Sequence, residues 1–215
     1  MSCHWLDPRY FQELARMDPA EVCARTGTKY CHDSAVYLLQ MLGRIAVVTP
    51  GRATALWRGP DGAEAPMTTE LALSALFYLL KCPAGLQPAS EWVSEKELKG
   101  GLYLFQGTHE LPLSLLAEAF GRDSRALLKA GQTLGGSRVE VGDVAVQVPA
   151  LPKLPIRIVV WLEDDEFPAS AKMLFPANAD KTLPLDILYG LACDVCRLIT
   201  TNRLQKDDTN SPHPG

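Results

Sequence analysis

The chain has 215 residues, enough for one domain with a substantial core; 47% of them are hydrophobic and 21% are charged. Its 21 basic and 25 acidic side chains give a formal net charge of −4. Because there is no basic surplus to displace counterions from a polyanion, we expect no broad binding to nucleic acid or to an anionic membrane surface.

The sequence also indicates a compartment. No apolar run approaches the roughly 20 residues that a membrane-spanning helix needs, so no membrane span is predicted. The first ten residues, MSCHWLDPRY, lack the basic and apolar regions of a secretory signal. We therefore expect a cytoplasmic protein, in which thiols stay reduced. The 6 cysteines are accordingly interpreted as free thiols or ligands, not as disulfides.

The first half of the chain predicts two short helices, a strand meander and a buried helix. Asp-Pro pairs at residues 7–8 and 18–19 are helix start signals, and Gly27 ends the second helix. Short β-favouring runs between residues 29 and 57, separated by turn residues, predict an antiparallel meander of three strands. Residues 67–82 are apolar on every side, which is typical of a helix at the centre of a core.

The second half predicts further helices, a hairpin, a buried strand and a terminal helix. Helices are expected over residues 112–120 and 124–134, and valine-rich runs around Gly142-Asp143 predict a hairpin. Residues 156–161 are β-branched and aromatic, which predicts a buried strand. Residues 185–204 carry apolar side chains at i, i+3, i+4 and i+7, which indicates a helix with one buried stripe.

These elements predict an α+β fold with one mainly antiparallel sheet covered by helices and a long C-terminal helix. Residues 92–98 are interpreted as a turn that leads into a short helix. No internal repeat or interdomain linker is visible, so we expect a single domain over residues 1–204. Residues 205–215 are polar and contain prolines, and they are predicted to form a disordered tail.

Residues 151–175 form the most strongly patterned segment of the chain. The predicted strand ends at Trp161, and four carboxylates follow in a row, from Glu163 to Glu166, before Phe167-Pro168. Adjacent like charges repel one another, so this connection is expected to stay in water or to meet a positive surface.

The inner carboxylates Asp164, Asp165 and Glu166 have two interpretations. They could bind a hard cation or supply a general acid and base, because loops at strand ends often carry function. The alternative is a solvated loop in which an inner carboxylate caps backbone amides or pairs with Arg157 or Arg44. A calcium loop is not indicated, because it needs ligands at alternating positions and a glycine turn.

This segment closely resembles the signature of a family of uncharacterised domains of about 200 residues, found mainly in anaerobic bacteria and archaea. The matching positions are Leu151-Pro152, Leu154-Pro155, Trp161, Asp164, Asp165, Glu166, Phe167, Pro168, Leu174-Phe175 and Leu183-Pro184-Leu185-Asp186. The resemblance extends upstream to residues 18–30 and to the Gly43-Arg44 turn, and it covers residues 7–200. It implies a family, and the family has no established activity.

Some members of that family look like this domain joined to an iron–sulfur domain of the type seen in corrinoid methyl-transfer proteins. The resemblance implies a setting in anaerobic redox or corrinoid metabolism, with a tetrapyrrole or corrinoid cofactor or with an iron–sulfur or corrinoid protein as partner. This chain lacks the cysteine cluster of such a domain, so the cluster is expected on a partner. The residues expected to bind are the 161–168 segment and Asp186.

Cys193 and Cys196 have the sharpest chemical spacing in the chain. Residues three apart on a helix share a face, so the two thiols could hold zinc or iron or act as a redox pair. Two ligands are only half of a site, and Cys196 lies beside the buried stripe, where cysteine behaves as a small hydrophobic residue. The adjacent pairs Cys3-His4 and Cys31-His32 could complete a site or be surface and turn residues.

His109 follows Gly107 in a predicted loop before a helix. It could be an axial ligand of tetrapyrrole iron or corrinoid cobalt, or a general base. The alternative is an exposed loop histidine. The chain contains no G-x-S-x-G, P-loop, G-x-G-x-x-G or H-E-x-x-H motif, which makes a familiar hydrolase or nucleotide enzyme a poor match.

Three functional hypotheses follow from the sequence. The leading one is a non-catalytic cytoplasmic binding or accessory domain, with a cofactor or a protein partner. The second is a metal-binding redox protein or metalloenzyme that uses Cys193 and Cys196. The third is a structural protein-interaction module, which an exposed apolar patch would favour.

Overall fold

The structure is a computed structural model that describes residues 6–207, with side chains described as far as Thr201. Within that part of the chain, two five-stranded antiparallel sheets and eight α-helices make up the fold. Buried residues of both sheets and of most helices join one hydrophobic cluster. The prediction of a single α+β domain with a long C-terminal helix is confirmed.

The first sheet, called sheet A, is a meander in which each strand pairs with the next along the chain. Its strands are β1 (Lys29–Cys31), β2 (Val36–Met41), β3 (Arg44–Thr49), β4 (Thr54–Arg58) and β5 (Glu64–Pro66). The prediction of three strands was wrong in number. β3 and β4 are two separate strands that pair with each other, because a 3₁₀ turn at Pro50–Arg52 reverses the chain between them. β5 carries no β-favouring signal of its own and forms on the edge of β4.

The second sheet, called sheet B, has the strand order β6-β10-β9-β8-β7. Its strands are β6 (Trp92–Ser94), β7 (Ser137–Val139), β8 (Val144–Leu151), β9 (Leu154–Trp161) and β10 (Ser170–Pro176). The hairpin at Gly142-Asp143 and the strand that ends at Trp161 agree with the prediction. β10 was not predicted, and β6 was interpreted as a turn. The two strands pair with each other, with Trp92 opposite Pro176.

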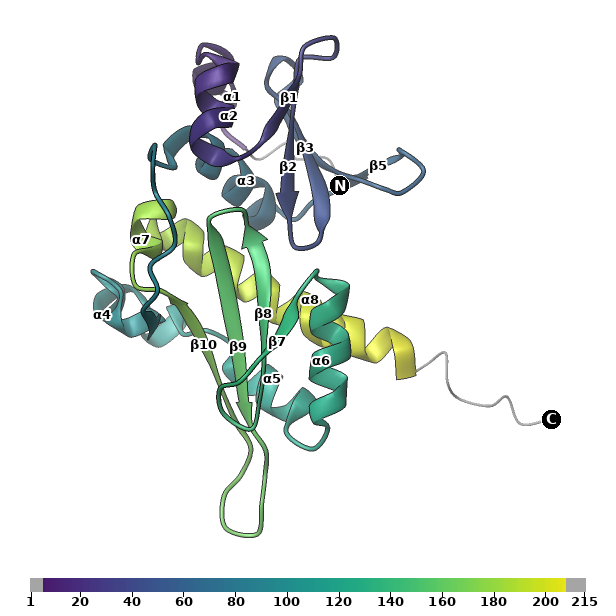
Figure 1. The fold of residues 1–215 in the computed structure, drawn as a ribbon, viewed down its shortest axis with the longest axis vertical. Helices are drawn as coiled ribbons and strands as arrows, with labels where there is room; N and C mark the ends of the chain where they lie inside the picture. The colour runs from purple at the N-terminus through teal and green to yellow at the C-terminus, as the bar shows by residue number, and fades with distance from the viewer. Residues whose placement is uncertain (1–5, 208–215) are drawn as a thin grey trace, which may run out of the picture.

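The strands thus form two sheets, whereas the sequence predicted one. The helices are α1 (Pro8–Ala15), α2 (Pro19–Thr26), α3 (Thr69–Lys81), α4 (Gly101–Leu104), α5 (Leu113–Phe120), α6 (Ser124–Thr133), α7 (Ala179–Thr182) and α8 (Leu185–Asp207). α8 extends past residue 204, its predicted end, so the prediction of a disordered tail from residue 205 is wrong for residues 205–207, and residues 208–215 lie outside the described part. Figure 1 shows sheet A with α1 and α2 at one end of the molecule and sheet B with α5, α6 and α8 at the other.

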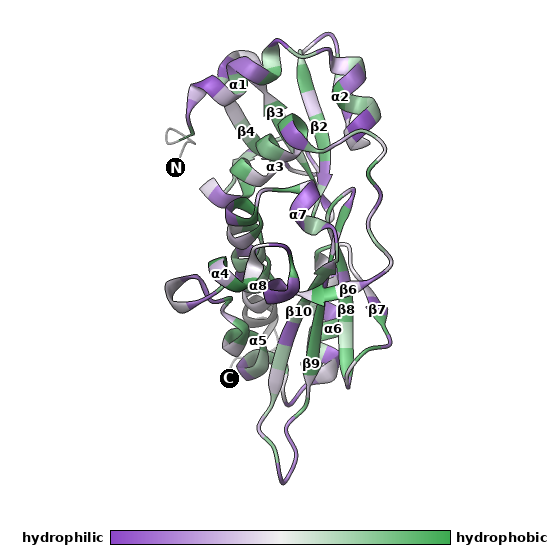
Figure 2. Ribbon diagram, turned by 90° about the vertical axis from the view of Figure 1, so that its left-hand side faces the viewer, coloured by the Kyte–Doolittle hydropathy of each residue, from purple (hydrophilic) through white to green (hydrophobic). Residues whose placement is uncertain are grey.

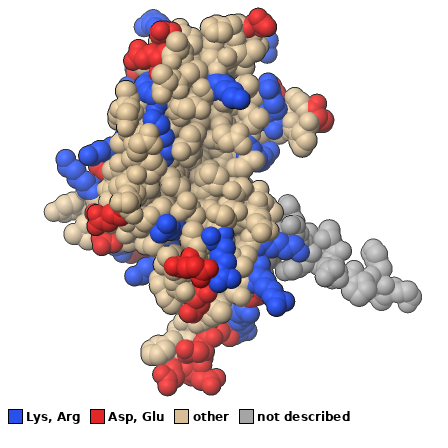
Figure 3. Space-filling model, in the orientation of Figure 1, with Lys and Arg blue, Asp and Glu red and all other residues tan. Residues whose placement is uncertain are grey.

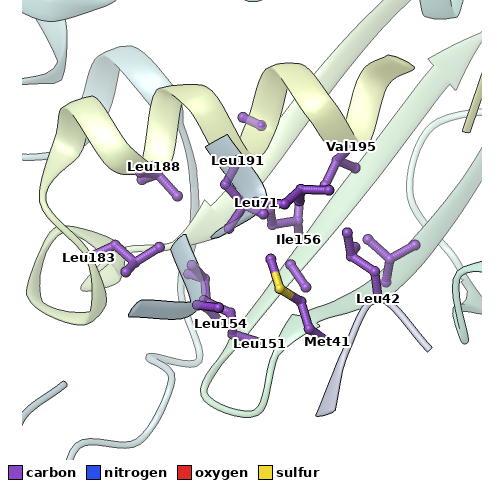
Figure 4. Packing of buried hydrophobic residues seen from close by; sticks show 14 of the residues in the cluster. Met41, Leu42, Leu71, Leu151, Leu154, Ile156, Leu183, Leu188, Leu191 and Val195 are labelled. Atoms are coloured by element: carbon purple, nitrogen blue, oxygen red, sulfur yellow. The ribbon is translucent and has the colours of Figure 1, made fainter. Parts of the chain in front are cut away.

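The core is continuous from one sheet to the other. Figure 4 shows Met41 and Leu42 of sheet A meeting side chains of α3, α8 and sheet B. Leu71 of α3 and Leu191 of α8 lie in the middle of this contact, as expected for a helix that is apolar on every side. In Figure 2 the central strands β8 and β9 of sheet B are mainly green, the colour of hydrophobic residues.

The C-terminal end of α3 is closed by a buried arginine. Arg25 of α2 is only 7% exposed, and its guanidinium donates to the carbonyls of Cys82 (2.8 Å), Leu80 (3.3 Å) and Leu79. Cys82 follows α3 in an extended conformation before Pro83, so no left-handed glycine cap is formed there. Arg25 therefore supplies the donors that the last carbonyls of α3 need, and its charge suits that end of the helix dipole.

Replacing this arginine is expected to weaken the whole domain. In Arg25→Leu the carbonyls stay buried without donors, so the free energy of unfolding should fall by about 2–4 kcal/mol. Urea denaturation followed by circular dichroism measures the loss. Arg16→Leu, at an exposed position, is the control and should change the free energy of unfolding by about 0.5 kcal/mol or less. Equal losses in the two variants would contradict the capping role.

Candidate functional site

The connection between β9 and β10, residues 162–169, is called the acidic loop. Figure 1 shows it extending beyond the end of sheet B, and Figure 3 shows acidic side chains gathered at its tip. Glu163, Asp164, Asp165 and Glu166 are all exposed. Phe167 is also 66% exposed, one of four exposed large hydrophobic side chains among the described residues, with Leu102, Tyr103 and Leu115.

Backbone hydrogen bonds give the acidic loop a defined shape. Asp164 Oδ1 accepts from the amides of Glu166 (2.9 Å) and Phe167 (2.7 Å), and the Asp164 amide donates to the Phe167 carbonyl at 3.0 Å. At the start of the loop, Asp143 Oδ2 accepts from the Leu162 amide at 2.8 Å. These carboxylates thus hold the turn, as Asp and Asn side chains do in many loops.

The remaining carboxylates of the loop differ in their partners. Glu163 Oε1 forms an ion pair with Arg122 Nε at 2.5 Å, and its amide donates to the Gly121 carbonyl at 3.0 Å. The structure assigns the Asp165 and Glu166 side chains neither a hydrogen bond nor an ion pair within residues 6–207. Two of the four charges therefore face solvent without compensation.

The base of the loop packs closely on the end of α5. A Cβ atom placed on Gly121 would lie 2.2 Å from the Ala169 Cβ, so this position accepts only glycine without a shift. Beside the contact is a shallow depression of about 480 Å³, lined by Ser114, Ala117, Glu118, Arg122, Glu163, Pro168 and Ala169. Its wall is shared between α5 and the acidic loop.

Trp161 and Asp186, also expected to bind, lie apart from each other. Trp161 is the last residue of β9, partly buried opposite Ser170, and Lys172 Nζ lies 5.9 Å from the centroid of its ring. Asp186 is exposed in the first turn of α8, where a negative charge suits the helix dipole. The length of β10 separates this turn from the acidic loop (Figure 1).

Cys193 and Cys196 are both buried in α8, and they meet different neighbours. Cys196 Sγ lies 3.5 Å from Met173 Sδ of β10, and burial raises the pKa of its thiol to about 12. Burial also raises the pKa of Cys193, which contacts the Tyr189 hydroxyl. Both groups are therefore protonated thiols at neutral pH, whereas metal ligation and thiol exchange use the thiolate.

No group of three or more His, Cys, Asp or Glu side chains among the described residues is arranged to hold a metal ion. The Cys31-His32 pair lies at the end of β1 and in the turn after it, far along the chain from α8. The Cys3-His4 pair lies outside the described residues.

His109 is exposed in the 3₁₀ turn Gly107–His109, and its ring centroid is 5.2 Å from that of Tyr189. Tyr189 Oη donates to the Thr108 carbonyl at 3.3 Å. Tyr189 lies one helical turn before Cys193, so the structure places two of the predicted site residues, His109 and Cys193, beside the same tyrosine. Sequence reasoning missed Tyr189, because only the fold places the loop against α8.

Asp194, between the two cysteines, was also missed. It is 2% exposed; its Oδ2 accepts from Thr68 Oγ1, and its Oδ1 accepts from Arg197 Nη1 at 3.2 Å. Thr68 also caps α3 by accepting from the Leu71 amide at 3.2 Å. Burial raises the pKa of Asp194 above its ordinary value of 3.8. The signal in the sequence was a charged residue inside an apolar helical stripe.

The raised pKa predicts a pH dependence of stability. A carboxyl group whose pKa is higher in the folded state stabilises the fold fully below its ordinary pKa, and this contribution is lost as the pH rises through the folded value. Asp194→Asn has no such loss, so its free energy of unfolding should increase relative to wild type as the pH rises above 3.8. Urea denaturation at several values between pH 4 and pH 7.5 measures the difference.

Asp194→Ala provides the comparison. This variant leaves the Thr68 hydroxyl without its acceptor, so we expect a loss of about 1–3 kcal/mol across the same pH range. If the wild-type and Asp194→Asn curves run parallel from pH 4 to pH 7.5, the raised pKa is wrong.

A second prediction concerns the base of the acidic loop. Gly121→Ala forces Ala169 away, so it should lower the free energy of unfolding by about 1–3 kcal/mol and speed amide exchange in residues 162–169. Hydrogen exchange with mass spectrometry measures the second effect. Gly51→Ala is the matched control, because a Cβ there meets nothing within 4 Å. Unchanged exchange in Gly121→Ala would refute the packing role of this glycine.

Across residues 6–207, no helix combines the length and the hydrophobicity needed to cross a membrane.

Comparison with known proteins gives a family without an activity. No curated protein and no solved structure matches the chain. The model of the family described as "Domain of unknown function (DUF3786)" matches residues 18–198, which is most of the chain. The chain therefore belongs to the DUF3786 family, an uncharacterised family as the signature in residues 151–186 predicted.

Proposed function

We propose that the chain is a binding or accessory domain that docks on a basic surface of a protein partner through the acidic loop. The observation that supports this most is the exposure of Phe167 beside the free carboxylates Asp165 and Glu166. An exposed aromatic side chain next to charges of one sign suits an interface with an apolar pocket and a cationic rim.

The loop has properties that favour association. Asp164 and Asp143 hold its backbone in place, so less conformational entropy is lost when it binds. The uncompensated charges attract a positive surface over about 8–10 Å at physiological salt and so raise the rate of encounter. Phe167 loses little rotamer freedom when it is buried and can contribute as an anchor.

The class of partner comes from the family resemblance. Relatives that look like this domain joined to an iron–sulfur domain imply a corrinoid or iron–sulfur protein of anaerobic redox metabolism as the partner. The cytoplasmic setting expected from the sequence is part of the same proposal. In this proposal the cluster belongs to the partner.

The metal or redox hypothesis based on Cys193 and Cys196 has less support. Their sulfur atoms contact Tyr189 and Met173 respectively, and both thiols are buried in the core. A role as small hydrophobic residues of α8 accounts for these contacts without a ligand.

Site-specific photo-crosslinking tests the proposal. We would introduce Phe167→p-benzoylphenylalanine in cells that express the protein naturally and identify the crosslinked protein by mass spectrometry. Tyr103→p-benzoylphenylalanine is the matched control, because Tyr103 is an exposed aromatic residue of α4, away from the loop. The proposal expects a protein that is crosslinked only from position 167.

Binding of that purified protein then tests the charges. Asp165→Asn together with Glu166→Gln should weaken binding about 10-fold, because each lost charge contact is worth about 0.5–1 kcal/mol. Affinity should also fall between 50 mM and 500 mM salt. The control variant Asp61→Asn with Glu64→Gln neutralises two exposed carboxylates near β5. Equal affinity of the loop variant, the control variant and wild type would rule out docking through the acidic loop.

A further inference from the structure

A second concave surface lies at the opposite end of the molecule, on sheet A. A depression of about 400 Å³ separates α2 from β1. The first turn of α2 and Cys23 form one wall, and Thr28, Lys29, Tyr30 and His32 form the other. Figure 1 shows the whole of sheet B between these elements and the acidic loop. This surface is independent of the docking proposal.

Thr28 carries the unusual feature of this depression. The residue is 6% exposed, and its Oγ1 is the one buried side-chain nitrogen or oxygen of the described residues that has no hydrogen-bond partner. Its neighbours are satisfied: Thr26 Oγ1 donates to the Val22 carbonyl at 2.6 Å, and Tyr78 Oη donates to the Thr26 carbonyl at 2.7 Å. An unpartnered hydroxyl destabilises the fold where valine would fill the same volume, so its presence points to a ligand.

Aromatic rings shape the outer part of the depression. The Tyr30 ring stands edge-on to the His32 ring at 5.0 Å and packs against Tyr37 of β2 at 4.7 Å. These contacts fix the Tyr30 ring, which lines the depression together with Cys23. The wall suits a planar ring, because offset and edge-to-face arrangements of aromatic groups are favourable.

The rim of the depression carries a lysine and a histidine. Lys29 is exposed there, and His32 is exposed next to it along the wall. Two carboxylates lie near the start of α2. Asp18 is engaged as the helix N-cap, where it accepts from the Ala20 amide at 3.0 Å, and Glu21 is exposed in the first turn but is not among the residues that line the depression. An anionic group at the rim therefore meets Lys29 and the amino-terminal end of α2.

From these features we propose that the depression binds a small aromatic carboxylate. The ring lies between Tyr30 and Cys23, the carboxylate reaches Lys29 at the rim, and a polar substituent at the inner end bonds to Thr28 Oγ1. Rotation about the Thr28 Cα–Cβ bond exchanges its hydroxyl and methyl groups between staggered positions, which brings the hydroxyl to the ligand.

Two probes test this site on the full chain: 4-hydroxybenzoate, and benzoate as the matched compound without the inner hydroxyl. Titrations followed by ¹H–¹⁵N correlation spectra should shift the amides of residues 19–32. We expect 4-hydroxybenzoate to bind at least 5-fold more tightly than benzoate. Thr28→Val should abolish that preference and leave benzoate binding unchanged, whereas Lys29→Met should weaken both probes at least 5-fold.

The stability of the free variants gives a second readout. Thr28→Val should keep or raise the melting temperature, because it removes an unsatisfied group, whereas Thr26→Val should lower it, because it breaks a satisfied bond. A fall in the melting temperature of Thr28→Val would show that its hydroxyl has a structural partner and would overturn the proposal. Amide shifts outside residues 19–32, or equal affinity of wild type for both probes, would overturn it as well.

Discussion

The contact between α3 and α8 is the constraint on which the rest of the structure depends. α3 lies against β3 and β4 of sheet A, and α8 packs with α5 and α6 over sheet B, so this contact joins the two halves of the core. Apolar packing between the helices is not directional and permits more than one register. The Thr68–Asp194 bond is directional, and it ties the beginning of α3 to one turn of α8. A buried carboxylate adds little to stability, and fixing a register is the role best documented for such groups.

A second junction joins the sheets directly. The β2–β3 turn places Leu42 at φ 50° and Gly43 at φ 70°, and the Leu42 amide donates to the Pro149 carbonyl of β8 at 3.0 Å. Leucine disfavours this left-handed conformation, but its side chain is 1% exposed within the shared core, which offsets the strain. Gly43 is required by contact as well, because a Cβ there would lie 2.7 Å from the Gly135 nitrogen. Two tight turns, far apart in the sequence, thus meet backbone to backbone.

Local chemistry explains which elements could be predicted from the sequence. The helices that begin at Asp7, Asp18, Thr68 and Asp123 were found because a capping side chain marks each start, and each accepts a backbone amide in the structure. β5 and β6 were not found, because three residues on a sheet edge take their conformation from a neighbouring strand. β10 was missed since its apolar residues follow Ser170 and Lys172 without a β-branched run. The position of the acidic loop followed from the strand before it, whereas Thr68 and Asp194 are 126 residues apart and nothing local connects them.

The two proposed binding surfaces each contain one side chain, Phe167 or Thr28, whose environment differs from that of most of the chain. Most of the chain obeys several rules at once: α1, α2, α3 and α6 begin with a capping side chain, buried side-chain polar groups are bonded, and each sheet edge is a strand of only three residues. Phe167 and Thr28 break these rules in opposite ways, one by exposing an apolar ring and the other by burying a free hydroxyl. Neither has a partner within the described residues that would offset its unfavourable position. The core and the two junctions account for the fold without these two side chains, and both proposals assign them a contact outside the chain.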